Sequence, residues 1–257
     1  MVSASPYDWS VKLPDAQRVV LDLFDSHDVV LLGEEHGIAN NLQFVCDLIP
    51  NLAGVGVHNI ALEFSAEEFQ GQSDELLAAD VYNPQIARDM LFGYNVGWPY
   101  LEYQQVHEAA WLFNRTHDAK VRLIHPSYRY DWSKWLGDRS PENMRGVMHR
   151  GGYNEFRAAR VSEVVLAGGK LLGLFGAVHA FSDSRNFEVF GLGKDFMSLG
   201  MLLKQKYGIA VASVKLNTGV PGYWDAELRT SSELRSCTID REFLSGRDFS
   251  EVLGSWP

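Results

Sequence analysis

The sequence predicts an α/β protein with an open, mostly parallel sheet of about five or more strands and helices on both faces. Short apolar runs rich in β-branched residues alternate along the chain with longer stretches whose apolar residues recur at helical spacing. The strand-like runs are continuously apolar, which is typical of parallel strands covered on both faces. A hydrophobic fraction of 46% against 22% charged residues supplies enough apolar side chains for a sizeable core.

Five segments carry the buried-strand pattern, and amphipathic segments precede and separate them. In the first helix, Val19, Val20, Leu23 and Phe24 fall on one face. Strands joined through helices imply right-handed crossovers between parallel strands. The expected strands are residues 29–33, 59–64, 120–124, 170–175 and 209–215, and the expected helices are residues 15–24, 40–52, 66–79, 84–92, 100–115, 153–167 and 197–207.

The chain is expected to form a single α/β domain over residues 1–257. The alternating pattern defines a core of about residues 15–219. Residues 125–152, rich in Trp, Tyr, Arg, Gly and Pro, are expected to be an insertion over one end of the sheet. Residues 220–257, where the periodicity weakens, are expected to be a C-terminal appendage.

Charge and cysteine content exclude several classes of function. The net charge of −10 argues against bulk electrostatic binding to nucleic acid or to an anionic membrane. The two cysteines, Cys46 and Cys237, form no CxxC pair, which argues against a zinc module or a disulfide scaffold and fits a reducing compartment. No apolar run reaches the roughly 18 residues of a membrane span, and the N-terminal residues lack a signal-peptide pattern. We therefore expect a cytoplasmic protein with a small-molecule or peptide substrate, without nucleic acid or membrane partners.

Several common catalytic motifs are absent from the sequence. It contains no Gly-x-Ser-x-Gly elbow, no P-loop, no Gly-x-Gly-x-x-Gly after the first strand and no His-Glu-x-x-His. Ordinary serine-hydrolase and nucleotide chemistry therefore have no support. Cys46 lies on an apolar helix face and is expected to be a core residue rather than a nucleophile.

The ends of the expected strands form the predicted functional site. In open parallel sheets, ligands bind beyond the carboxyl ends of the strands. His36 follows the first expected strand, Glu63 closes the second, His125 follows the third and His179 follows the fourth. Four of the five expected strands thus deliver a histidine or a glutamate to one edge of the sheet.

Two of these histidines share the spacing Gly-x-x-His, at residues 33–36 and 176–179. Glycine is expected to let the backbone turn sharply off the strand and to leave room for a substrate. Imidazole can serve there as general base, general acid or metal ligand. A carboxylate of Glu34, Glu35 or Glu63 can orient the imidazole or complete a metal site. Since Glu34 and Glu35 are adjacent on an extended chain, only one of them is expected to face the site.

The other histidines and the aromatic residues carry weaker signals. His125 is expected to be either a ligand or a packing residue, and His107, on a helix, a packing residue. The aromatic-rich residues 94–103 can line an apolar pocket or cap the core. The histidines expected to be solvated are His27, His58, His117 and His149.

At these positions the sequence resembles the superfamily that joins erythromycin esterases, ChaN-like haem-uptake proteins and the Tiki/TraB group. The first strand of that superfamily ends in Gly-Glu-x-His or Gly-Glu-x-x-His, and residues 31–37 read Leu-Leu-Gly-Glu-Glu-His-Gly. Glu63 matches the glutamate that closes the second strand. Residues 156–163 are similar to an Arg-rich helix signature, and residues 175–180 match the second glycine–histidine motif. The resemblance covers about residues 29–219.

The resemblance implies a parallel-sheet α/β fold and, in several branches, hydrolysis. In the esterase-like branch the first-motif histidine, here His36, is thought to activate water. The neighbouring acids of that branch correspond to Glu34, which this pattern favours over Glu35, and to Glu63. The Tiki-like branch implies a metal-dependent peptidase, and the ChaN-like branch implies haem binding without catalysis.

The leading hypothesis is a hydrolase that activates water for attack on an ester or amide carbonyl. His36 is the expected base, Glu34 or Glu63 orients its imidazole, and Arg157 or His179 stabilises the oxyanion.

Three alternatives stay open at this stage. One is a purely structural relative of the superfamily with a degenerate site. In a metal-assisted variant, Zn²⁺ or Mn²⁺ is held by His36, His179 and Glu63, with or without His125, and lowers the pKa of bound water. In a protein without catalysis, haem or another apolar ligand binds among the aromatic residues, with a Tyr or His as axial ligand.

Overall fold

The computed structural model describes residues 16–96, 100–138, 140–183 and 196–216. The chain divides into two compact units, one of residues 21–219 and one of residues 1–20 with 220–257, and residues 16–20 are the described part of the second. The sheet and every predicted site residue belong to residues 21–219. The predicted single domain over the whole chain stays a prediction, and the expected appendage at residues 220–257 lies outside the described residues.

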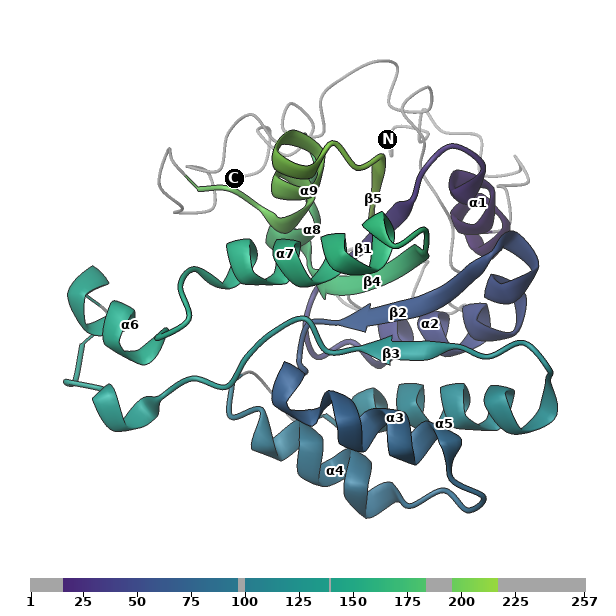
Figure 1. Ribbon diagram of the computed structural model, residues 1–257, viewed down its shortest axis with the longest axis horizontal. Coiled ribbons are helices and arrows are strands. Elements are labelled where there is room, and N and C mark those ends of the chain that lie inside the picture. Colours follow the sequence, from purple (N-terminus) through teal and green to yellow (C-terminus); the bar gives the residue numbers. More distant parts are fainter. Residues whose placement is uncertain (1–15, 97–99, 139, 184–195, 217–257) are drawn as a thin grey trace, which may run out of the picture. The chain divides into compact units, whose positions relative to one another are not determined.

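The predicted open parallel sheet is confirmed, with all five expected strands present (Figure 1). The strand order is β3-β2-β4-β1-β5, and each neighbouring pair is parallel. The strands are β1 (Val29–Glu34), β2 (Val57–Leu62), β3 (Arg122–Ile124), β4 (Lys170–Gly176) and β5 (Val211–Lys215).

The expected helices are also present, each within a few residues of its predicted ends. The segment predicted as one helix at residues 66–79 is divided into a 3-10 turn, Glu67–Phe69, and a following α-helix. Two helices were not predicted, α6 inside the expected insertion and α8 directly after β4. The α-helices are α1 (Ala16–Asp22), α2 (Ala39–Leu52), α3 (Gln70–Ala78), α4 (Pro84–Gly93), α5 (Leu101–Thr116), α6 (Pro141–Val147), α7 (Tyr153–Leu166), α8 (Ala177–Ala180) and α9 (Leu199–Tyr207).

Helix ends in this fold follow local sequence signals. The Asn83 side chain accepts a hydrogen bond from the Gln85 N–H at the start of α4, directly before a proline at the first helical position. Ser198 caps α9 in the same way. Gly208 then ends α9 with a left-handed φ of 68°, a conformation that costs glycine little.

Helices cover both faces of the sheet, which explains its continuously apolar strands. On one face, Val29, Leu31 and Phe175 pack into a core shared with α7 and α9. Alternate strand residues such as Leu32 and Leu174 are equally buried and point to the opposite face, because side chains alternate along a strand. That face carries α2, α5 and the helices that pack on α5 (Figure 1).

The strand order places the predicted site at the middle of the sheet. β4 lies between β1 and β2, and Glu34 is in register with Gly176. The three strands that carry the glycine–histidine motifs and Glu63 are therefore immediate neighbours. In the described ranges, no helix is both long and apolar enough to span a bilayer.

Candidate active site

The carboxyl ends of β1, β2 and β4 bring four predicted site residues together. Glu34 is the last residue of β1 and His36 follows two residues later. Glu63 directly follows β2, and its N–H donates to the Leu174 carbonyl of β4 at 3.0 Å. His179 lies in α8, the short helix that begins as β4 ends.

His36 lies between two carboxylates. Its Nδ1 is 3.1 Å from Glu34 Oε1, and the Tyr103 hydroxyl donates to that same oxygen. Its Nε2 is 3.9 Å from Glu63 Oε2. In the neutral ring, the carboxylate of Glu34 therefore holds the proton on Nδ1 and leaves the lone pair on Nε2.

The surroundings of His36 favour its protonated form. Burial lowers the pKa of His36, but the hydrogen bond to Glu34 and the negative charge of Glu63 outweigh burial. The pKa of His36 consequently lies above its ordinary value. Its side chain is 24% exposed, against 0% for Glu34 and 6% for Glu63, so in this group of charges the imidazole is the part that solvent reaches.

Glu63 is the centre of a buried network of charges. Its Oε1 lies 3.2 Å from Arg157 Nη2 and 3.4 Å from His179 Nε2, and its Oε2 accepts the Gly176 N–H at 2.5 Å. Burial raises the pKa of Glu63, but Arg157, His179 and the Gly176 N–H together lower it below its usual range. Glu63 is thus an ionised structural anion whose two oxygens are already engaged.

Arg157, on α7, is held by neutral partners as well as by Glu63. Its Nε donates to Ser127 Oγ at 2.9 Å, and Ser127 Oγ in turn donates to the Glu63 carbonyl at 2.9 Å. The guanidinium carbon lies 5.4 Å from the centre of the Tyr153 ring, a cation–π distance. Arg157 Nη1 is buried without a hydrogen-bond partner among the described residues.

His179 is a neutral histidine. Burial lowers the pKa of His179 to about 4, and the charge of Glu63 only partly opposes burial. Because the carboxylate of Glu63 faces Nε2, the proton lies on Nε2 and the lone pair on Nδ1. Within the described residues that Nδ1 has no hydrogen-bond partner.

Between pH 7 and pH 4, His179 alone is expected to lower the free energy of unfolding by about 3 kcal/mol. The unfolded chain binds a proton at this residue below pH 6.5, whereas the folded chain binds it only near pH 4, so stability falls as pH falls through that window. Urea unfolding at several pH values measures the effect. In His179→Gln this contribution is absent; an equal stability difference between variant and wild type at pH 7 and pH 4 would contradict it.

Gly176 is required by close packing and not by a special backbone turn. A Cβ atom there would lie 2.7 Å from His36 Nε2 and 3.3 Å from Glu63 Oε2. At Gly33, a Cβ atom would lie 3.0 Å from the α-carbon of Ala177. Neither glycine has a positive φ, so it is the lack of space for a Cβ atom, and not a left-handed backbone, that requires glycine at these positions. Gly33 lets α8 pack closely on β1, and Gly176 leaves room for the His36 ring.

Glu35, His125 and Cys46 lie apart from this network. Glu35 is half exposed, with its carboxylate 3.8 Å from Lys215 Nζ. The ring of His125 is fully buried and contacts His107, with 6.0 Å between the ring centres. Burial raises the pKa of the Cys46 thiol to about 11, so this thiol stays protonated at neutral pH.

The residues that the sequence did not predict come mainly from helices and loops. Tyr103 on α5 donates to Glu34, Ser127 bridges Arg157 to the backbone of Glu63, and Tyr94 lies 3.5 Å from Arg157 Nη2. Tyr94 and Tyr103 belong to the aromatic-rich stretch. The aromatic composition of that stretch predicted an apolar pocket or a cap on the core, and nothing in the sequence indicated that the tyrosine hydroxyls would bind Glu34 and Arg157.

The arrangement does not fit the Zn²⁺ or Mn²⁺ site considered from the sequence. In the described part of the chain, no three His, Cys, Asp or Glu side chains are placed to hold a metal ion. The guanidinium of Arg157 already neutralises Glu63 at 3.2 Å, where a second cation would be repelled. His125, the optional fourth ligand, has His107 as its ring partner instead.

Comparisons with known proteins reveal similarity of fold only. The chain matches no protein-family model and no curated protein. Among solved structures, a Bacillus cereus protein is 13% identical with a TM-score of 0.55, covering 76% of this chain and 66% of that one. Pasteurella multocida toxin is 14% identical with a TM-score of 0.52, covering 79% of this chain and 25% of the toxin; a thiol-protease-like catalytic triad is described in its C-terminal region.

A third similar structure is ChaN of Campylobacter jejuni, described as binding haem cofacially. It is 17% identical with a TM-score of 0.49, and the match covers 80% of this chain and 87% of ChaN. Sequence identities this low indicate similarity of fold and not of catalytic or binding chemistry. The Bacillus cereus protein and the Pasteurella multocida toxin accordingly support the α/β fold of this chain.

Proposed function

We propose that this protein is a hydrolase in which His36 activates water for attack on an ester or amide carbonyl. The observation that carries the proposal is the environment of that imidazole. His36 is partly exposed, and its Nδ1 lies 3.1 Å from Glu34 Oε1, which fixes the proton on Nδ1. Oε2 of the buried Glu63 lies 3.9 Å from His36 Nε2. A partly exposed imidazole whose orientation a carboxylate fixes through one ring nitrogen is the arrangement that general base catalysis requires.

In the proposed step, His36 Nε2 takes a proton from water as the water oxygen bonds to the carbonyl carbon. The imidazolium that forms is stabilised by the negative charges of Glu34 and Glu63. The carbonyl π electrons move to the oxygen to give a tetrahedral oxyanion. When that oxyanion collapses, the bond to the leaving group breaks and the imidazolium returns the proton to the leaving atom.

Arg157 is the better of the two oxyanion donors considered from the sequence. His179 presents a lone pair at Nδ1 and commits its N–H to Glu63, so it has no proton to offer. Arg157 stays charged and has N–H groups at Nη1 without a partner among the described residues. One well-placed donor stabilises such a transition state by about 3 kcal/mol.

The esterase-like branch of the resembled superfamily agrees with this assignment of His36 and Glu34. The haem-binding alternative fits less well. An axial ligand lies against a flat, apolar porphyrin, whereas His36 Nε2 lies beside the Glu63 carboxylate. The buried charges around His36 suit a proton-transfer role better than a porphyrin face.

The test is a panel of esters, lactones and amides incubated with the full chain, before and after treatment with a metal chelator. We expect turnover of at least one carbonyl class. The chelator should not change the rate, because the guanidinium of Arg157 already neutralises Glu63 and no metal ion is needed there. In parallel, haemin is added and the Soret band recorded. Absence of turnover across the panel, together with one haemin bound per chain and lost in His36→Gln, would replace the hydrolase by a haem-binding protein.

A further inference from the structure

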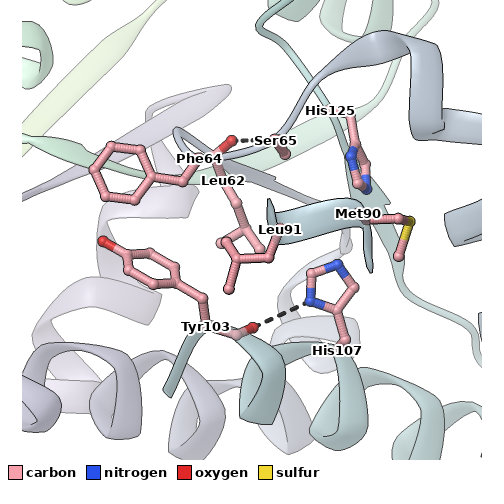
Figure 2. A pocket seen from close by; sticks show the side chains of 8 residues that line it. All are labelled: Leu62, Phe64, Ser65, Met90, Leu91, Tyr103, His107 and His125. Carbon is pink, nitrogen blue, oxygen red and sulfur yellow. Dashed lines mark hydrogen bonds between the residues drawn. The ribbon is translucent and has the colours of Figure 1, made fainter. Parts of the chain in front are cut away.

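A second group of polar side chains surrounds a cavity of about 10 Å³, away from the Glu63 network (Figure 2). The cavity lies beyond the ends of β2 and β3, against α4 and α5. Apart from the serine Ser65, whose hydroxyl donates to the Leu62 carbonyl, and the Tyr103 hydroxyl already bound to Glu34, its polar groups are two histidines. The side chains that matter here are His107, His125 and Met90.

Both histidines are buried, with 5% of the surface of His107 and 1% of that of His125 exposed. His107 Nδ1 donates to the Tyr103 carbonyl at 3.1 Å, which leaves the lone pair on Nε2. His107 Nε2 and both ring nitrogens of His125 lack a hydrogen bond of good geometry with a described residue, although the Ala66 backbone interacts with the His125 ring. Buried polar atoms are almost always paired in folded proteins, so this cavity is built for an occupant.

The geometry of the two rings fits one metal ion between them. The ring centres are 6.0 Å apart and the ring planes are inclined by 67°. A metal–imidazole bond of about 2 Å puts the ring centre about 3 Å from the ion, so two imidazoles on one ion have centres about 6 Å apart or slightly less. In Figure 2 the unpaired nitrogen of His107 and a nitrogen of His125 point toward each other beside Met90.

The residues that line the cavity favour Cu(I) over Zn²⁺. The thioether of methionine is a soft ligand that suits Cu(I), and imidazole binds copper as well as zinc. The described lining residues include no carboxylate and no thiolate, so the two charges of Zn²⁺ would be buried without compensation, whereas Cu(I) brings only one.

We propose that His107, His125 and Met90 form a binding site for a single Cu(I) ion. None of the three residues belongs to the Glu63 network, and Tyr103 is the residue that contacts both sites, through its carbonyl to His107 and its hydroxyl to Glu34. The Tyr103 carbonyl acts as the outer partner that fixes the His107 tautomer, as in many metal sites.

The test is a titration of the full chain with Cu(I), kept reduced by ascorbate under anaerobic conditions, against a chromophoric Cu(I) chelator. We expect one tightly bound Cu(I) per wild-type chain, with X-ray absorption showing two nitrogen ligands and one sulfur. His125→Phe is expected to weaken binding at least 100-fold, and Met90→Leu, which keeps the volume of the side chain, about tenfold. His58→Gln, at an exposed histidine outside the cavity, is the matched control and should bind as wild type does.

Two results would overturn the proposal. One is a wild-type chain that releases all Cu(I) to the chelator. The other is a bound Cu(I) whose affinity is unchanged in both Met90→Leu and His125→Phe, which would place the ion elsewhere on the chain. Should His125→Phe fail to fold, Met90→Leu and the sulfur signal decide alone.

Discussion

His36→Gln is expected to lower kcat for the carbonyl substrate by about 10²–10⁴-fold, the usual contribution of a general base. Glutamine keeps a polar side chain of similar length but cannot accept the proton of water. The measurement is steady-state hydrolysis with whichever ester or amide gives turnover. His58→Gln serves as the control, because His58 is exposed and its Nδ1 bonds only to the Lys120 carbonyl at 3.0 Å.

The pH profile separates a catalytic base from a merely structural histidine. The base works unprotonated, so kcat/KM should rise with pH through the pKa of His36. Glu34 is a positioning residue that raises this pKa, and Glu34→Gln should move the midpoint to lower pH while lowering kcat. Full turnover in His36→Gln, or a midpoint unmoved in Glu34→Gln, would contradict the mechanism.

Glu63→Ala is expected to lower the free energy of unfolding by about 3–5 kcal/mol. The substitution leaves the guanidinium of Arg157 buried without its carboxylate, and breaking one partner of a buried ion pair typically costs that much. It also removes the acceptor of the Gly176 N–H. Chemical denaturation of wild type and variant at pH 7 measures the difference.

Two further variants test the cause of that loss. Glu67→Ala removes a more exposed glutamate paired with Arg150 and Arg160, and should cost about 1 kcal/mol or less. The double variant Glu63→Ala, Arg157→Met removes both buried charges and should recover part of the stability. A Glu63→Ala loss no larger than that of Glu67→Ala would show that the buried network does not stabilise the fold.

Most of the fold could be predicted because its signals are local. Continuous apolar runs marked every strand, and apolar spacing marked the long helices. The four-residue α8 could not be predicted in this way, since it is about one turn long and shows no periodicity. α6 was missed because Trp, Arg and Gly around it indicated a loop, although Ser140 caps it and a proline starts it.

The site was predictable only as far as strand ends determine it. Parallel strands bring their carboxyl ends to one edge, which correctly gathered Glu34, His36, Glu63 and His179. The same rule failed for His125, because β3 is an edge strand that contacts α3 and α5, and the chain beyond it turns the His125 ring toward α5. Tyr103 and Ser127 reach the site through long-range packing, of which a single sequence carries no local trace.

The strand order also has a consequence for the way the chain acquires its structure. β1 pairs with β4 and β5 and has no ladder to β2, so this apolar strand can pair only with segments made much later. Glu63 likewise meets the Gly176 N–H across 113 residues of chain. Contacts of such long range close slowly, since the entropy of the intervening loop is lost before they form. During synthesis, the apolar side chains of residues 29–32 therefore stay exposed to solvent, where chaperones can bind them, until β4 has left the ribosome.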